Sequence, residues 1–154
     1  MKRVLVTGMS GVGKSTLLDE LASRGHATVD TDYGDFLEVV DGERLWRRER
    51  IEAVLRDAAA GGAGVLFVQG TVRNQGLFYP WFDHIVLLSA PAEVLAERLS
   101  TRTTNSYGKN PAELAETLGY VETVEPLLRA SATLELVTTV PVARVADAIL
   151  EHVR

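Results

Sequence analysis

The sequence predicts an α/β fold of three layers, in which helices flank a central parallel sheet of about five strands. Short apolar, β-branched runs alternate with longer helix-like segments along the 154 residues, which is the order that parallel βαβ units require. Two of the runs, residues 65–69 and 84–88, are apolar nearly throughout, as strands buried on both faces are. We expect a single domain over residues 1–154, because a chain of this length can bury its own core.

The expected strands share a short length and an apolar or β-branched composition. They are residues 3–7, 27–30, 65–69, 84–88 and 134–137. The expected helices lie between and after these strands. They are residues 14–24, a charged helix at 43–60, one helix after Pro91, one after Asn110, and a final amphipathic helix from 142 to 153.

Start and stop signals support several of these helices. Gly25 is placed to cap the end of the first helix, and Pro91 suits the first turn of another. Asn110, Pro111 and Glu113 combine a capping side chain, a proline at the first helical position and a reciprocal carboxylate. A helix is therefore expected to begin at Asn110.

Composition and charge exclude several classes of protein. The chain has no cysteine, which excludes a disulfide framework and a thiolate zinc site and fits a reducing cytosol. The net charge is −5 and the basic residues are spread, so no patch for nucleic acid is expected. No apolar stretch reaches the length of a membrane span, and Gly8 interrupts the first apolar run too early for a signal peptide. We expect a cytoplasmic monomer or weak dimer that binds neither nucleic acid nor membrane.

Residues 8–15 read G-M-S-G-V-G-K-S and match the phosphate-binding pattern G-x-x-x-x-G-K-[ST] in full. The glycines let successive backbone N–H groups converge on a β-phosphate, and the following helix N-terminus adds partial positive charge. Lys14 is expected to bridge the β- and γ-phosphates, and the Ser15 hydroxyl to coordinate Mg²⁺. The expected cofactors are therefore ATP and Mg²⁺. The residues expected to bind the nucleotide are Gly8, Ser10, Gly11, Val12, Gly13, Lys14, Ser15 and Thr16.

Other interpretations of this loop fit less well. A dinucleotide-binding fingerprint has a third glycine where this chain has Thr16. A nucleophile elbow has a glycine where this chain has Val12. A plain strand-to-helix turn needs glycines for its backbone angles but does not need a Lys-Ser pair. The pattern therefore indicates a P-loop.

A pair of carboxylates follows the second expected strand, in the sequence V-D-T-D. Asp30 and Asp32 lie near the predicted triphosphate, where they can hold Mg²⁺ through water and engage an acceptor hydroxyl. Without the P-loop, the same residues would indicate an acidic loop with an Asx turn. The strand at 65–69 ends in Gln69, where many P-loop ATPases carry a metal-binding aspartate. The expected metal ligands are therefore Ser15, Asp30 and Asp32.

With G-M-S-G-V-G-K-S and D-T-D in place, the chain resembles the small-molecule kinases of the shikimate kinase, gluconate kinase and nucleoside monophosphate kinase group. It is not a close match to any one of them, and the resemblance covers most of the chain in element order. It implies that Asp30 lies near the metal and that Asp32 lies near the acceptor, as orienter or base. It also implies substrate contacts for Gln69-Gly70, and for Arg47 if that arginine matches one that meets substrate anions.

A polar, glycine-containing segment at residues 100–110 separates two expected helices. Phosphoryl transfer needs a lid that excludes water, and this segment suits one. The resemblance implies that Arg102 packs on the adenine and that Lys109 reaches the transferring phosphate. Lys109 stands where arginine is usual, which leaves a point charge without a bidentate fork. The expected catalytic residues are Lys14, Asp32, Arg102 and Lys109, whereas Arg98 is expected to be a structural residue on a helix surface.

The acceptor is expected at the carboxyl end of the strand at 65–69, because ligands of open α/β sheets bind at that edge. Shikimate kinases hold the acceptor's carboxylate with an arginine shortly before a Pro-Leu segment. Here Glu125 precedes Pro126 and Arg129 follows it, so shikimate itself is not expected as the substrate. The residues expected to recognise the acceptor are Asp32, Arg47, Gln69, Gly70, Arg73, Asn74 and Gln75.

These features predict an ATP-dependent phosphotransferase that moves the γ-phosphate to a hydroxyl of a small molecule. Two alternatives stay open. The first is a nucleotide-binding or hydrolysing module that acts through a protein partner and uses residues 100–110 as a switch. The second is a nucleoside monophosphate kinase, in which Arg47 and Arg73 hold the acceptor's phosphate.

Overall fold

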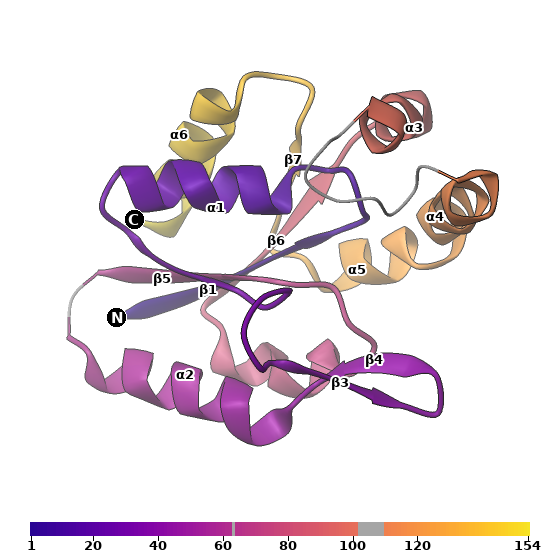
Figure 1. Ribbon diagram of the computed structural model, residues 1–154. Coiled ribbons are helices and arrows are strands. Elements are labelled where there is room, and N and C mark those ends of the chain that lie inside the picture. Colours follow the sequence, from indigo (N-terminus) through magenta and orange to yellow (C-terminus); the bar gives the residue numbers. More distant parts are fainter. Residues whose placement is uncertain (63, 102–109) are drawn as a thin grey trace.

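The computed structural model describes residues 1–62, 64–101 and 110–154, and its middle layer is a five-stranded sheet (Figure 1). The strand order is β2-β5-β1-β6-β7, and every neighbouring pair in this sheet is parallel. The predicted α/β class with a central parallel sheet of about five strands is confirmed. The strands are β1 (Lys2–Gly8), β2 (Ala27–Asp30), β5 (Val65–Gln69), β6 (His84–Ser89) and β7 (Leu134–Val137).

Helices cover both faces of this sheet, as the three-layer prediction requires. Figure 1 shows α1 and α6 on one face and α2 with the 3₁₀ helix η1 on the other. Each face has its own apolar core, because alternate residues of β1, such as Val4 and Leu5, belong to different buried clusters. The helices are α1 (Lys14–Ser23), α2 (Arg48–Ala60), η1 (Gln75–Trp81), α3 (Ala92–Thr101), α4 (Pro111–Thr123), α5 (Glu125–Ser131) and α6 (Val142–Val153).

A small antiparallel hairpin of β3 (Leu37–Val40) and β4 (Glu43–Trp46) lies outside the main sheet. The prediction of one helix over residues 43–60 is therefore wrong at its start, because residues 43–46 are a strand. Asp41 and Gly42, which join the two strands, have φ angles of 52° and 79°. Positive φ at both central residues is the geometry of a type I′ turn, which Asp-Gly favours.

The predicted helix start at Asn110 is confirmed. Its side-chain oxygen accepts a hydrogen bond of 2.8 Å from the backbone N–H of Glu113, and Pro111 is the first residue of α4. The expected lid falls largely on residues 102–109, so Arg102 and Lys109 lie outside the described residues. No helix in the described part of the chain is long and apolar enough to span a bilayer.

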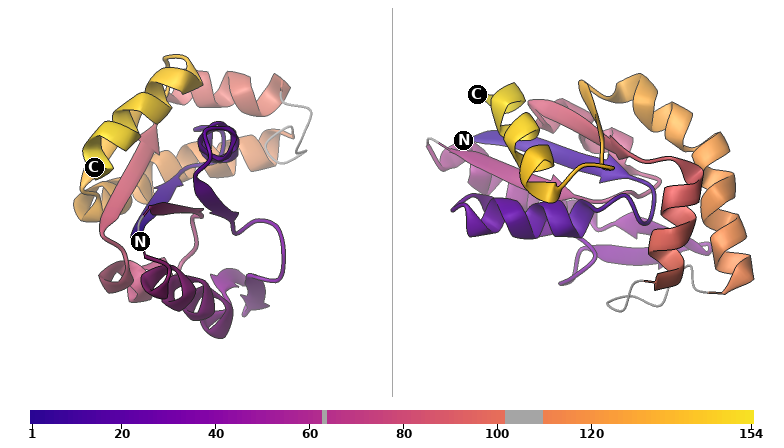
Figure 2. Two further views of the ribbon diagram at one scale, coloured as in Figure 1. Left: turned by 90° about the vertical axis from the view of Figure 1, so that its left-hand side faces the viewer. Right: turned by 90° about the horizontal axis from the view of Figure 1, so that it is seen from above.

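The loops that follow β1, β2 and β5 leave the sheet at the same edge, because these three strands are parallel neighbours. The two chain ends lie on the opposite side of the molecule (Figures 1 and 2). Ligands of open parallel sheets bind at the carboxyl edge of the strands. The fold therefore brings the predicted P-loop and the predicted carboxylate pair to one place.

Candidate nucleotide and acceptor site

The P-loop joins β1 to α1, and its shape depends on glycine. Gly8, Gly11 and Gly13 have φ angles of 153°, 89° and 101°, in the region that favours glycine. A Cβ atom on Gly8 would lie 2.4 Å from the backbone oxygen of Leu88, so no larger residue fits there without rearrangement. The loop ends at Lys14, the first residue of α1. This is a glycine-rich loop that leads into a helix N-terminus, as phosphate binding requires.

Lys14 lies over the loop that precedes it. Its Nζ donates hydrogen bonds to the backbone oxygens of Gly8 at 2.7 Å and Met9 at 3.2 Å. The ammonium group is therefore held above the loop whose backbone N–H groups would surround a phosphate. A cation in this position can neutralise the charge of a bound polyphosphate.

The predicted metal ligands lie together. The Ser15 hydroxyl donates a hydrogen bond of 2.7 Å to Oδ2 of Asp30, and the backbone N–H of Asp32 donates one of 3.0 Å to Oδ1 of Asp30. One hydroxyl and two carboxylates form an all-oxygen set, which is the chemistry that Mg²⁺ prefers. These three residues would hold the cation beside the P-loop.

Gln69 was expected to recognise the acceptor, and the structure places its side chain against the carboxylate pair. The side chain is fully buried, and its Nε2 donates hydrogen bonds to Oδ1 of Asp30 and, at 3.1 Å, to Oδ2 of Asp32. Its Oε1 is buried and has no hydrogen-bond partner among the described residues. The Gln69 amide therefore contacts both carboxylates that are predicted to bind the metal.

Gly70 marks the point where the hairpin packs against the end of β5. A Cβ atom at Gly70 would lie 2.5 Å from Oγ1 of Thr31 and 2.7 Å from Cζ2 of Trp46. Thr31 donates a hydrogen bond of 2.8 Å to the backbone oxygen of Gln69 and accepts one of 3.0 Å from the Trp46 indole. The missing side chain at Gly70 thus allows the close contact that fixes the hairpin beside the site.

Asn74 and Gln75, both expected to contact the acceptor, bind neighbouring protein groups. The Asn74 amide accepts from the backbone N–H of Trp46 at 2.9 Å and donates to its carbonyl at 3.1 Å. The buried Gln75 amide donates to Oγ1 of Thr7 at 3.2 Å and to the Tyr79 hydroxyl at 3.0 Å. Asn74 thus holds the hairpin, and Gln75 holds the start of η1 against β1.

The two arginines expected at the acceptor both form ion pairs with carboxylates of the hairpin region. Arg47 lies 3.3 Å from Asp35 and donates a hydrogen bond to the backbone oxygen of Leu37 at 3.2 Å. Arg73 lies 3.0 Å from Glu43, and its side chain is 75% exposed. Their charges are therefore balanced locally.

Thr71, which was not among the predicted site residues, lies beside the first glycine of the P-loop. Its hydroxyl accepts a hydrogen bond of 3.1 Å from the backbone N–H of Gly8, donates one of 2.6 Å to the Gly8 carbonyl, and lies 3.0 Å from the Thr7 hydroxyl. Thr71 follows β5 and Thr7 belongs to β1, so their contact depends on strand pairing. The only signal in the sequence is a hydroxyl side chain just after a buried strand.

Arg98 was expected to be structural, and the structure gives it a specific partner. Its Nη1 donates to the backbone oxygen of Gly11 at 3.1 Å and to Oγ1 of Thr138 at 3.0 Å, and its Nη2 donates to the Thr138 carbonyl at 2.6 Å. The guanidinium therefore links the middle of the P-loop to the segment that follows β7.

Arg129 has no role in the site described above and forms an ion-pair network between α5 and β7. It lies 2.9 Å from Glu125 and 2.7 Å from Glu135. The hydrogen bond from Arg129 lowers the pKa of the Glu135 carboxyl, and a hydrogen bond from the Ser89 hydroxyl adds to this effect. The Glu125 carboxylate is therefore engaged by a cation of its own helix.

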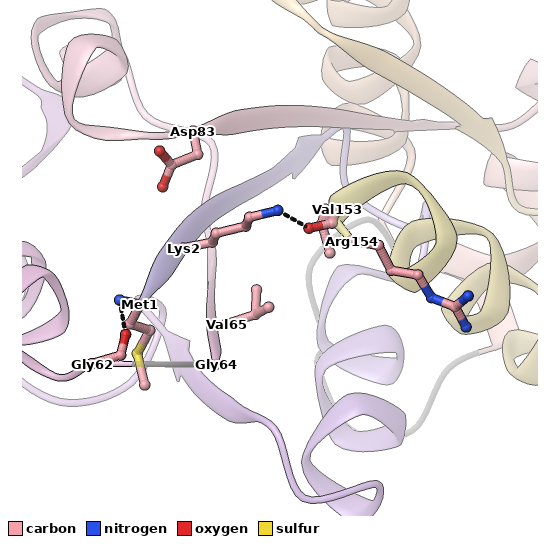
Figure 3. Close-up of a pocket in the computed structure, with 8 residues that line it drawn as sticks. All are labelled: Met1, Lys2, Gly62, Gly64, Val65, Asp83, Val153 and Arg154. Atoms are coloured by element: carbon pink, nitrogen blue, oxygen red, sulfur yellow. Dashed lines mark hydrogen bonds between the residues drawn. The ribbon is translucent and has the colours of Figure 1, made fainter.

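A shallow pocket of about 460 Å³ lies at the amino ends of β1 and β5, shown in Figure 3. Lys2 crosses this region and donates a hydrogen bond of 2.8 Å to the backbone oxygen of Val153. The pocket contains no P-loop residue and belongs to the opposite edge of the sheet. Its lining residues are Met1, Lys2, Gly62, Gly64, Val65, Asp83, Val153 and Arg154.

The fold and the glycine-rich loop together define a P-loop nucleotide-binding protein. The chain belongs to the AAA domain family, whose model matches residues 4–119. A comparison with curated proteins gives no match.

Solved structures share the fold over nearly the whole chain. A shikimate kinase from Acinetobacter baumannii in complex with shikimate has a TM-score of 0.70 at 22% identity, covering 99% of this chain and 93% of its own. A sugar kinase from Janibacter sp. HTCC2649 has a TM-score of 0.63 at 19% identity, with coverage of 98% and 93%. A gluconokinase from Sinorhizobium meliloti 1021 has a TM-score of 0.60 at 18% identity, with coverage of 97% and 90%. The resemblance to the small-molecule kinase group, without a close match to one member, is confirmed.

Proposed function

We propose that this protein is an ATP-dependent phosphotransferase that moves the γ-phosphate of ATP to a hydroxyl group of a small molecule. The observation that carries the proposal is the contact between Ser15 of the P-loop and Asp30 of the D-T-D sequence. This contact joins the phosphate-binding half of the site to a pair of carboxylates. The second carboxylate, Asp32, lies against the same Gln69 amide as Asp30 and supplies a group that can orient an acceptor hydroxyl.

The P-loop provides the donor half of the site. Its backbone N–H groups would bind the β-phosphate, and Lys14 would neutralise charge that develops on the β- and γ-phosphates during transfer. Ser15, Asp30 and Asp32 would hold Mg²⁺, which shields the phosphate oxygens when it is bound. Arg98 keeps the P-loop in shape through its bond to Gly11.

Asp32 provides the acceptor half. The acceptor's hydroxyl oxygen forms a bond to the γ-phosphorus, while the bond from that phosphorus to the β–γ bridging oxygen breaks and ADP leaves. The hydroxyl proton passes to the Asp32 carboxylate or to solvent, so Asp32 orients the hydroxyl and can accept its proton. In the lid, Lys109 would add positive charge at the transferred group and Arg102 would pack on the adenine.

The ion pairs of Arg47 and Arg73 bear on the choice of acceptor. A nucleoside monophosphate kinase uses arginines to bind the acceptor's phosphate, yet both arginines here already face carboxylates, Asp35 and Glu43. A phosphate bound there would have to compete with these carboxylates for the two guanidinium groups. We therefore favour an acceptor without a phosphate group over a nucleoside monophosphate.

The test measures ADP formation from ATP and Mg²⁺ with fractions of a cell metabolite extract, and then with each nucleoside monophosphate. We expect one or more extract fractions to raise turnover, and mass spectrometry to find one added phosphoryl group on a small molecule. Turnover that no fraction changes would point instead to a nucleotide-hydrolysing module. Turnover raised by one monophosphate alone would identify a nucleoside monophosphate kinase.

A further inference from the structure

Gln69 occupies the end of β5, next to the P-loop strand. The register of the sheet pairs Gln69 with Val6 on one side and with Asp30 on the other. Its side chain is fully buried, so it does not contact a diffusing acceptor directly. The contacts of its amide nitrogen with Asp30 and Asp32 are the only hydrogen bonds that its side chain makes among the described residues.

The chemistry of this position explains why an amide is suitable there. Two carboxylates that accept hydrogen bonds from one N–H₂ group are held at a fixed separation and orientation. A carboxylate at residue 69 would instead place a third negative charge against Asp30 and Asp32. Like charges in one partly buried site repel, so such a group would favour a bound divalent cation.

We propose that Gln69 is a positioning residue that holds Asp30 and Asp32 in place for the metal and the acceptor, and that the metal site takes its negative charge from β2 and the loop after it instead of from β5. This inference deepens the proposed function and rests on it. Gln69 acts through the two carboxylates and does not touch the reacting groups.

The chain offers a matched control in Gln75. Its side chain is 3% exposed, against 0% for Gln69, and its amide is also fully within the protein. Its amide partners are neutral, the Thr7 and Tyr79 hydroxyls and the backbone N–H of Val72. The substitutions Q69E and Q75E therefore bury the same new carboxylate, one beside two negative charges and the other beside none.

The first experiment measures thermal unfolding with Mg²⁺ alone, without nucleotide or acceptor. When a chelator removes all Mg²⁺, we expect Q69E to unfold at a lower temperature than the parent protein. Adding millimolar Mg²⁺ should then raise the unfolding midpoint of Q69E by about 4 °C or more. The midpoint of Q75E should not respond to Mg²⁺ beyond the response of the parent. Potassium chloride at equal ionic strength controls for charge screening.

The second experiment uses Q69L, which removes the amide without adding charge. We expect the Mg²⁺ concentration for half-maximal nucleotide binding to rise about tenfold, because groups that orient metal ligands contribute to metal affinity on this scale. Nucleotide binding in chelator should stay unchanged. An equal loss of binding with and without Mg²⁺ would assign Gln69 a merely structural role and overturn the proposal.

An equal shift of the unfolding midpoints of Q69E and Q75E by Mg²⁺ would also overturn the proposal that Gln69 positions the two carboxylates. If Q69E folds only when Mg²⁺ is present, the proposal is supported, whereas failure to fold in both conditions while Q75E folds counts against it. Neither experiment requires phosphoryl transfer. If both experiments give the expected results but no extract component is phosphorylated, the positioning role of Gln69 stands and the proposed kinase function is refuted.

Discussion

The Ser15 hydroxyl donates a hydrogen bond of 2.7 Å to Asp30, although Ser15 lies in the helix that follows β1, Asp30 ends β2, and β5 separates these two strands in the sheet. The first turn of α1 therefore reaches across the end of β5 to the end of β2. Gln69, at the end of β5, donates a hydrogen bond to the other carboxylate oxygen of Asp30. The site is thus assembled over three adjacent strand ends.

Replacing Lys14 by alanine should abolish phosphoryl transfer while leaving the fold intact. The ammonium group donates hydrogen bonds to the backbone oxygens of Gly8 and Met9, and its removal deletes the charge that stabilises the transferred phosphate. We expect kcat to fall by at least about 100-fold, with unchanged circular dichroism. Lys2→Ala, at the opposite edge of the sheet, should keep parent activity, and transfer by Lys14→Ala at the parent rate would refute the role of the loop.

Replacing Arg98 should weaken nucleotide binding, because its guanidinium joins the P-loop at Gly11 to Thr138. Arg98→Met keeps much of the side-chain length but removes these bonds, and we expect the nucleotide Kd to rise about tenfold by calorimetry. Arg98→Lys keeps the charge but cannot form the same fork of hydrogen bonds. It should recover only part of the affinity, and full recovery would show that charge alone matters.

Gly70→Ala should destabilise the protein by about 1–3 kcal/mol, because a Cβ would lie 2.5 Å from Thr31 and 2.7 Å from Trp46. Gly119→Ala provides the control. Gly119 lies in α4, and a Cβ there would meet nothing within 4 Å. That substitution should stabilise the protein by about 0.5–1 kcal/mol through helix propensity. Urea denaturation measures both, and similar effects at the two sites would contradict the packing at Gly70.

Stability should fall with acidification partly because of Glu135. Its pKa in the folded protein is lowered from an ordinary 4.5, chiefly by the hydrogen bond from Arg129. A group whose pKa is lower when folded adds stability above its unfolded pKa, and that stability is lost as the pH falls through the folded pKa. Glu135→Gln should therefore make the free energy of unfolding less dependent on pH below about 4.5. A parent-like pH profile in this variant would exclude a contribution from Glu135.

Local signals in the sequence are sufficient to predict most of the strands and helices. The strands at 27–30, 65–69 and 134–137 match their predicted bounds, because short apolar and β-branched runs bounded by polar or glycine residues form strands in many contexts. The hairpin was missed although Asp41-Gly42 is a strong turn signal between two short β-prone runs. The many charged residues from 43 onward are typical of an exposed helix, and they led to a predicted helix over 43–60 that begins before the observed start of α2 at Arg48.

The sequence by itself determined the P-loop and the five strands of the main sheet in their order along the chain, because these depend on neighbouring residues and on periodicity. Only the tertiary structure decided which polar side chains meet. Gln69 and Asp30 are 39 residues apart, and Arg98 and Gly11 are 87 apart, so neither contact leaves a local pattern. Parallel strands bring their carboxyl ends to one edge, and the register of β2, β5 and β1 then selects the side chains that touch there.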